Sequence, residues 1–456
     1  MKRSYRLLCL LALFCPTPVW ANSIADFFSN CAKPSAIPGR ILTVGPRSEA
    51  QGAYPGINAA LQAARPGDTI TLATGDYGDL ILTGTNEGGF ITIAAAQGQS
   101  PRFTKIRIGG GKPASRWRLT GLTVTGSNMA AEGYLATILS SDNIIFDQNR
   151  LHSQDGTMQW KPVKNSGSPD SPPHGISARQ SSCISIQDNS IRNVFHGVEF
   201  GGDQKGSNGK FFLISGNTID NFAGDGIEHY GSHVRILNNR ITNGHNLCNN
   251  QCVHSDGIQG WVYNSLPVTN TDVVIDGNTI IAQTSPDLAL PVETLQGITI
   301  FDGKWDGVRI TNNLVITNTW HGISIYGVNN AAIINNTIAP LNPKRNGWIM
   351  VNRGKKDPPG TVYNVVRRNN VLPGVIKPIP PTPGFTWDHD IAFRNAEEFS
   401  KAFVKFDPAS FSFDMRPSRG SPVIGAGSRD GAPATDIEGR SRTGTIDAGA
   451  YAYAGK

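Results

Sequence analysis

The sequence repeats one short unit through the middle of the chain: an asparagine, any residue, then an aliphatic side chain. Each copy follows a stretch in which apolar and polar residues alternate. The copies begin at Asn149, Asn189, Asn217, Asn239, Asn278, Asn313, Asn336 and Asn370. The closest copies, Asn217 to Asn239 and Asn313 to Asn336, are 22 and 23 residues apart. Three short strands with their turns need about this length to return the chain beneath its start, so the repeat predicts a solenoid of stacked coils.

Composition and alternation give the predicted fold class, an all-β parallel β-helix. The 456 residues include 51 glycines and 29 prolines, and only 17% are charged, which favours short strands and turns over helices. Alternation places one apolar set inside the coil. The repeated asparagine predicts a ladder of amides that bond the next coil.

Four segments are predicted along the chain. Residues 1–21 form a signal peptide, and 22–68 form an N-terminal segment whose amphipathic stretch at 54–64 is a helical cap. The β-helix covers 69–372. Residues 373–456 form a proline-rich linker and a C-terminal cap over the last open coil.

The first residues predict export. Lys2 and Arg3 precede an apolar stretch at 7–14, and a small-x-small cleavage site ends at Ala21. That stretch is too short to span a bilayer, and no later one is long enough. We therefore expect a periplasmic or secreted protein without a membrane span.

Four cysteines would stay after cleavage, and an even number in an oxidising compartment predicts disulfides. Cys248 and Cys252 could close one small loop, whereas pairing of Cys31 with Cys183 follows only by elimination. The alternative is a metal site formed by two cysteines with His245 and His254.

The formal net charge of +6 gives a mild positive field that suits an anionic partner. Lysine and arginine form no clustered stripe, so nucleic acid is not expected as a partner. We expect a monomer.

Residues 225–261 hold the densest set of acids, histidines and aromatic residues. A second signature, a polar residue before Gly-Ile or Gly-Val, falls between the asparagine marks. Its first positions are His174, His196, Asp225, Asp256, Gln296 and His321, and the residues three further on are Ser177, Glu199, Glu228, Gln259, Thr299 and Ser324. Because stacked strands lie about 4.8 Å apart, the second set should form one outward row.

The chain resembles the secreted right-handed parallel β-helix proteins of the pectate-lyase-like superfamily. The opening ALQAARPGDTITLATGDYGDL and the closing SPVIGAG, TDIEGR and DAGAYAY carry this resemblance, together with H-x-D-x-I-Q-x-W at 254–261. It implies a right-handed solenoid. The superfamily contains lyases, C5-epimerases, glycoside hydrolases and non-catalytic binders. The acid pairs typical of polygalacturonases and the basic motifs typical of chondroitinase B are absent, so their residues are not carried over.

The leading hypothesis is a polysaccharide lyase that cleaves an acidic, uronate-containing exopolysaccharide by β-elimination. Such an enzyme must neutralise the sugar carboxylate, remove the C5 proton and protonate the leaving oxygen. Alternatives are a C5-epimerase, a glycoside hydrolase that uses Asp225 or Glu228 with Asp256, and a non-catalytic glycan-binding or structural protein.

The hypothesis assigns a role to each candidate residue. Asp225, Glu228 and Asp256 would hold Ca²⁺, the one cofactor expected. His254 is the first choice of base, followed by Lys304 and His321, and Tyr230 is the candidate acid. Predicted substrate-binding residues are Glu199, His229, Gln259, Trp261, Gln296, Asp302, Trp305 and Tyr326, with Tyr326 also considered as the acid and both tryptophans as stacking platforms.

Overall fold

The structure is a computed structural model of the 456-residue chain. It describes residues 27, 29–35, 39–45, 54–126, 133–156, 171–202, 209–245, 254–262, 268–288, 295–354, 357, 363–374 and 384–455. The predicted signal peptide and the Cys248–Cys252 pair lie outside these residues.

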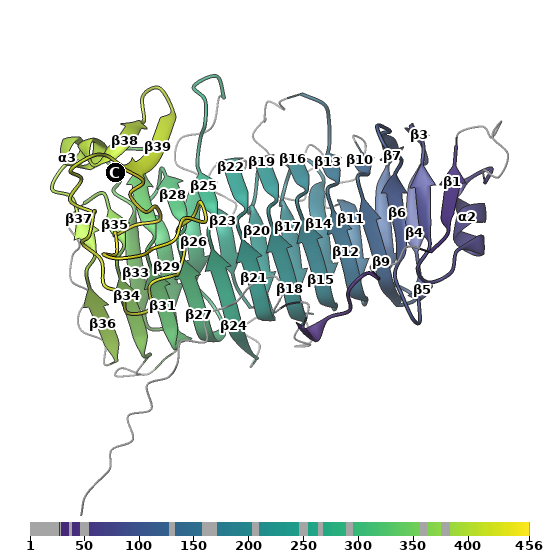
Figure 1. The fold of residues 1–456 in the computed structure, drawn as a ribbon, viewed down its shortest axis with the longest axis horizontal. Helices are drawn as coiled ribbons and strands as arrows, with labels where there is room; N and C mark the ends of the chain where they lie inside the picture. The colour runs from purple at the N-terminus through teal and green to yellow at the C-terminus, as the bar shows by residue number, and fades with distance from the viewer. Residues whose placement is uncertain are drawn as a thin grey trace, which may run out of the picture.

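Three long parallel sheets run along the molecule (Figure 1), and each full coil contributes one strand to each sheet. The strands given below are those of the described residues. Sheet A has 15 strands: β1 (Ile41–Val44), β2 (Thr69–Leu72), β5 (Gly84–Thr85), β6 (Ile91–Ala95), β9 (Ala114–Thr120), β12 (Asp142–Asp147), β15 (Ser182–Gln187), β18 (Lys210–Ser215), β21 (Ser232–Leu237), β24 (Thr269–Asp276), β27 (Lys304–Thr311), β30 (Val328–Asn329), β31 (Ala331–Ile334), β34 (Val365–Arg368) and β36 (Phe385–Asp388). Sheet B has 12 strands: β3 (Gly75–Asp76), β7 (Pro101–Phe103), β10 (Thr123–Thr125), β13 (Arg150–His152), β16 (Ser190–Val194), β19 (Thr218–Phe222), β22 (Arg240–Gly244), β25 (Thr279–Ile281), β28 (Leu314–Thr317), β32 (Thr337–Pro340), β35 (Val371–Leu372) and β37 (Ile391–Ala392). Sheet C has 10 strands: β4 (Asp79–Leu82), β8 (Lys105–Gly109), β11 (Tyr134–Leu139), β14 (His174–Arg179), β17 (Val198–Gly201), β20 (Ile227–Tyr230), β23 (Ser255–Gly260), β26 (Leu295–Ile300), β29 (His321–Tyr326) and β33 (Trp348–Asn352).

The predicted all-β parallel solenoid is confirmed, and its stack extends past the predicted limits of 69–372. Strand β1 already pairs with β2 in parallel, and β36 and β37 continue sheets A and B beyond residue 372. The interior is one continuous apolar core of aliphatic side chains from all three sheets. In sheet C its inward row is Ile176, Val198, Ile227, Ile258, Ile298 and Ile323, all at most 1% exposed.

The repeated asparagines form the predicted ladder at the turn from sheet A to sheet B. The Nδ2 of Asn217 donates to Asn239 Oδ1 at 2.9 Å, and the same oxygen accepts the backbone N–H of Asn217 at 3.0 Å. This pattern repeats from Asn149 to Asn370. Asp390 ends the ladder: its Oδ1 accepts hydrogen bonds from the backbone N–H of Asn370 at 2.7 Å and from its Nδ2 at 2.9 Å. The ladder gives buried turn amides a partner in every coil.

Both ends of the solenoid are covered. Helix α2 (Ile57–Ala63) lies at the N-terminal end, within the predicted stretch 54–64, and buries Ala60. At the other end lie α3 (Ala396–Lys401) and the antiparallel hairpin of β38 (Phe403–Asp407) and β39 (Ser412–Pro417) (Figure 1). The described residues contain no helix long and apolar enough to cross a membrane.

A disulfide joins Cys31 to Cys183, the pairing that elimination had left open. It ties the N-terminal segment to β15 in the middle of sheet A (Figure 1). Phe27 of that segment packs with Leu213 and Leu237.

Candidate functional site

The predicted outward row exists on sheet C. Ser177, Glu199, Glu228, Gln259, Thr299 and Ser324 pair in register across six consecutive strands. The glycine of the second signature has a steric reason: a Cβ on Gly197 would lie 2.4 Å from the Gly226 oxygen and 2.6 Å from Ile219 Cγ2. Coils approach too closely there for any side chain. The polar residue before each glycine therefore lies at the N-terminal edge of sheet C.

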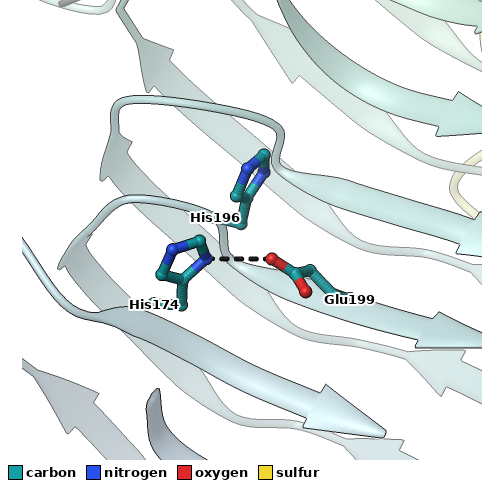
Figure 2. Close-up of side chains that lie close together, drawn as sticks. All are labelled: His174, His196 and Glu199. Carbon is teal, nitrogen blue, oxygen red and sulfur yellow. Dashed lines mark hydrogen bonds and ion pairs between the residues drawn. The ribbon is translucent and has the colours of Figure 1, made fainter. Parts of the chain in front are cut away.

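Glu199 is the most strongly paired acid of the row. His174 Nδ1 lies 2.9 Å from its Oε1 (Figure 2), while the Tyr134 hydroxyl and the Arg179 guanidinium donate to its Oε2 at 2.9 and 2.8 Å. Burial raises the pKa of Glu199, but the His174 hydrogen bond and the neighbouring positive charges outweigh burial and leave the pKa below its usual range. Glu199 is therefore ionised at neutral pH.

Glu228, one coil further on, is protonated at neutral pH, whereas Glu199 is ionised. Trp261 Nε1 donates to its Oε1 at 2.5 Å, while Arg179 lies 3.9 Å away from that oxygen. Burial and then the charge of Glu199 raise the pKa of Glu228 to about 8. Two adjacent carboxyls thus differ in charge at neutral pH, an arrangement typical of acid–base sites.

His254 and Asp256 form a hydrogen-bonded pair at the next coil. His254 Nδ1 lies 2.7 Å from Asp256 Oδ2, which also accepts from Gln259 Nε2 at 3.0 Å. Thr299 donates to the other oxygen at 2.9 Å. The Asp256 side chain is fully buried, whereas that of His254 is 40% exposed. The pair therefore presents an oriented imidazole at the surface above a fixed carboxyl.

Asp225 connects this pair to the glutamates. Its Oδ1 accepts the Asp256 backbone N–H at 2.8 Å, and its own backbone N–H donates to His196 Nδ1 at 2.8 Å. Burial and then the charge of Asp256 raise the pKa of Asp225 well above its usual range, and burial raises that of Asp256. Burial lowers the pKa of His196 to about 3, so this ring is neutral.

The predicted calcium ligands do not come together as a set. Among the described residues, His196, Asp225 and Glu228 have possible ligand atoms within 4.8 Å of one another, as do His174, His196 and Glu199 (Figure 2). Asp256 belongs to neither group. Calcium prefers oxygen ligands, and His196 Nδ1 already accepts a backbone hydrogen bond. These residues fit Ca²⁺ poorly, and we assign no step to a metal.

An aromatic group continues the row beyond Asp256. Phe301 has edge-to-face contacts with His254 at 5.7 Å and with His321 at 5.3 Å between ring centroids. Trp348 Nε1 donates to His321 Nδ1 at 3.3 Å, so Nε2 carries the proton of the neutral ring. Burial, followed by the nearby charge of His254, lowers the pKa of His321. Tyr326 touches Phe301 and donates to Met350 Sδ at 3.1 Å.

Three predicted site residues are buried with their polar or ring groups already engaged, and their assigned roles are wrong. His229 is fully buried between Phe200 and Trp305, with ring centroids 5.8 and 5.3 Å away. Trp305 is 1% exposed and donates to the Asp302 carbonyl, so it offers no face to a sugar. Tyr230 is 3% exposed, and its hydroxyl donates to the Gly202 carbonyl, which removes it as the acid.

The remaining predicted residues divide by location. Gln259, Trp261 and Gln296 lie in or beside the row, and Gln296 pairs with Asp256 in register. Lys304 is exposed at the start of β27 in sheet A, and Asp302 is exposed in the preceding turn. Neither stands in the sheet C row.

Sequence reasoning missed several residues of the site. His174 and His196 occupy the same position before glycine as Asp225, so the signature itself marked them. Tyr134 and Arg179 follow no repeat and gave no signal. They reach the site only because coils stack.

Comparisons with known proteins give one family match and several solved structures of low sequence identity. Residues 170–338 match the family model described as a right-handed β-helix region. Pectate lyase Pel9A is 17% identical with TM-score 0.43, covering 91% of this chain and 97% of its own. An alginate lyase from Paenibacillus sp. str. FPU-7 is 17% identical with TM-score 0.45, covering 69% and 98%. A search of curated proteins finds no match. The three parallel sheets, with the family match over residues 170–338, give the fold of the chain as a right-handed parallel β-helix, the fold that the resemblance implied.

Proposed function

We propose that the row on sheet C is the active site of an exported enzyme that acts on an acidic polysaccharide, and that it cleaves the polymer by β-elimination. The His254–Asp256 pair carries this proposal, because it sets an exposed imidazole on a buried carboxyl. On the adjacent strand Glu228 holds a proton at neutral pH, since its pKa is raised to about 8. The Cys31–Cys183 disulfide supports export, since disulfides persist in oxidising compartments.

Each step of the elimination has a residue. With Nδ1 bonded to Asp256, Nε2 of His254 is the ring nitrogen that accepts the C5 proton of the uronate. The electron pair of that C–H bond forms the C4–C5 double bond while the C4–O4 bond breaks. Protonated Glu228 supplies the proton that O4 requires. The Arg179 guanidinium stabilises the charge that develops on the sugar carboxylate.

A glycoside hydrolase is the second candidate, and a separate observation favours it. Glu199 and Glu228 are adjacent carboxyls, one ionised and one protonated, as a hydrolase needs for its nucleophile or base and its acid. A C5-epimerase would share proton removal by His254 without cleavage.

The test is a panel of uronate polymers incubated with the full chain, with and without chelator. New ultraviolet absorbance from unsaturated ends means elimination, and new reducing ends without absorbance mean hydrolysis. A changed epimer ratio without cleavage means epimerisation. Binding without any reaction across the panel would refute the enzyme proposal.

His254→Gln is the decisive variant. It should lower turnover about 10²–10⁴-fold, because it removes the base. His233→Gln is a matched control: His233 lies 2.9 Å from Asp272 and is 39% exposed, but it stands on sheet A. Equal activity of the His254→Gln variant and the wild type would exclude His254 as the base.

A further inference from the structure

Two tryptophans form an exposed aromatic platform at the C-terminal end of sheet C. Trp320 is 42% exposed, the most exposed large aromatic side chain among the described residues. Its ring stacks on Trp348, with centroids 5.6 Å apart and 23° between the planes. The Arg345 guanidinium lies 5.9 Å from the Trp320 centroid. Stacking fixes the orientation of a large apolar face that stays open to solvent.

The platform is continuous with the candidate active site. Trp348 hydrogen-bonds His321, whose ring contacts Phe301, and Phe301 contacts His254. From β23, which follows His254, to β33, which begins at Trp348, sheet C advances by three strand spacings. The platform therefore begins about 10 Å along the solenoid axis from the base, at Trp320 before β29, and ends about 14 Å away, at Trp348.

The side chains of the platform indicate which class of ligand it would bind. A rigid indole face beside polar groups suits the apolar face of a pyranose ring, and a neighbouring guanidinium suits a carboxylate. Lys344, exposed next to Arg345, adds positive charge. A neutral sugar would use the ring face but not the two cations.

We infer that Trp320, Trp348 and Arg345 form a distal subsite that stacks one uronate unit of a polymer lying along the solenoid axis. This inference rests on the proposed function. The subsite lies two to three coil spacings from His254, so a polymer lying along the axis reaches it with sugar units beyond the reacting one. Oligomers too short to reach from His254 to Trp320 gain nothing from it.

The test compares Trp320→Ala with Trp320→Phe and with Ile81→Ala, an exposed control on the far end of the same sheet. Affinity is measured by retardation in native gels that contain alginate or polygalacturonate, and turnover is measured on dimers and hexamers of the same uronates. Trp320→Ala should weaken affinity for the polymer about twofold to tenfold and leave turnover on dimers unchanged. Trp320→Phe should keep most of the wild-type affinity. Arg345→Gln should weaken binding of these polymers but not of a neutral glucan.

Three results would overturn the inference. If the wild type cleaves a uronate polymer and Trp320→Ala behaves identically, the subsite is wrong while the proposed function stands. If Trp320→Ala lowers turnover equally on dimers and on hexamers, Trp320 does not act at a distance from the reacting unit. If the wild type neither binds nor cleaves any uronate polymer, both proposals fail.

Discussion

Replacing Glu228 by glutamine should make the protein more stable and less active. Glutamine has nearly the shape of the protonated carboxyl and can keep the acceptor for Trp261 Nε1. It cannot ionise and cannot supply a proton to a leaving oxygen. Wild-type turnover should also fall as pH rises through about 8, where Glu228 loses its proton.

The size of the stability gain follows from the pKa of Glu228, which is about 8 in the folded chain against a usual 4.5. A carboxyl whose pKa is raised by folding holds its proton more tightly when folded. As pH rises above the usual value, the unfolded chain releases the proton first, so the wild type loses stability. Linkage gives a loss of about 3 kcal/mol at pH 7 and about 5 kcal/mol at pH 9, and almost none at pH 4. The glutamine variant avoids this loss.

Urea unfolding followed by tryptophan fluorescence at pH 4, 7 and 9 measures the difference between the two proteins. Glu199→Gln is the matched control with the opposite sign. Its carboxylate is ionised and bonded to His174 and Arg179, so its loss should destabilise by about 3–5 kcal/mol at pH 7. A gap between wild type and Glu228→Gln that is the same at all three pH values would refute the reasoning.

Two further predictions concern the scaffold. Asn239→Ala removes the side-chain hydrogen bonds to Ile214, Asn217 and Asn278 and should lower the free energy of unfolding in urea by about 3–5 kcal/mol. Arg240→Ala, on the exposed side of the same turn, should have little effect, and equal effects of the two variants would contradict the ladder's role. Cys31→Ser should lower the free energy of unfolding by about 5 kcal/mol, because the disulfide closes a sequence separation of 152; an unchanged stability would show that the bridge constrains the unfolded chain little.

The alternation of apolar and polar residues and the spacing of the repeated asparagine were sufficient to predict the solenoid. Alternation placed Glu199 and Glu228 on one wall, and the asparagine spacing set the turn that brings successive coils into register. The same rule should have excluded His229, because it follows an outward Glu228 and must point inward. A histidine beside an acid resembled a site, but strand geometry decided its direction.

Residues outside the repeat could not be placed from the sequence. Arg179 reaches Glu199 from the end of β14, and Tyr134 reaches the same carboxylate from two strands away, at a sequence separation of 65. Such contacts depend on how side chains lean between coils, and no sequence period encodes that. The contacts of Glu199 with Arg179 and Tyr134 therefore could not be predicted from the sequence.

The two polar rows of this solenoid differ in a way that separates scaffold from function. The asparagine ladder is buried, neutral and bonded at each step, so it satisfies the turn without charge. On sheet C, by contrast, Glu228 of the row and Asp225 and Asp256 at the edge beside it are buried close together, and the pKa of each is raised. A coil could place neutral side chains there, as Ser177 and Ser324 show at either end of the row. Because these acids lower stability where neutral residues would serve the fold, their place beside an exposed histidine is best explained by chemistry performed at that edge.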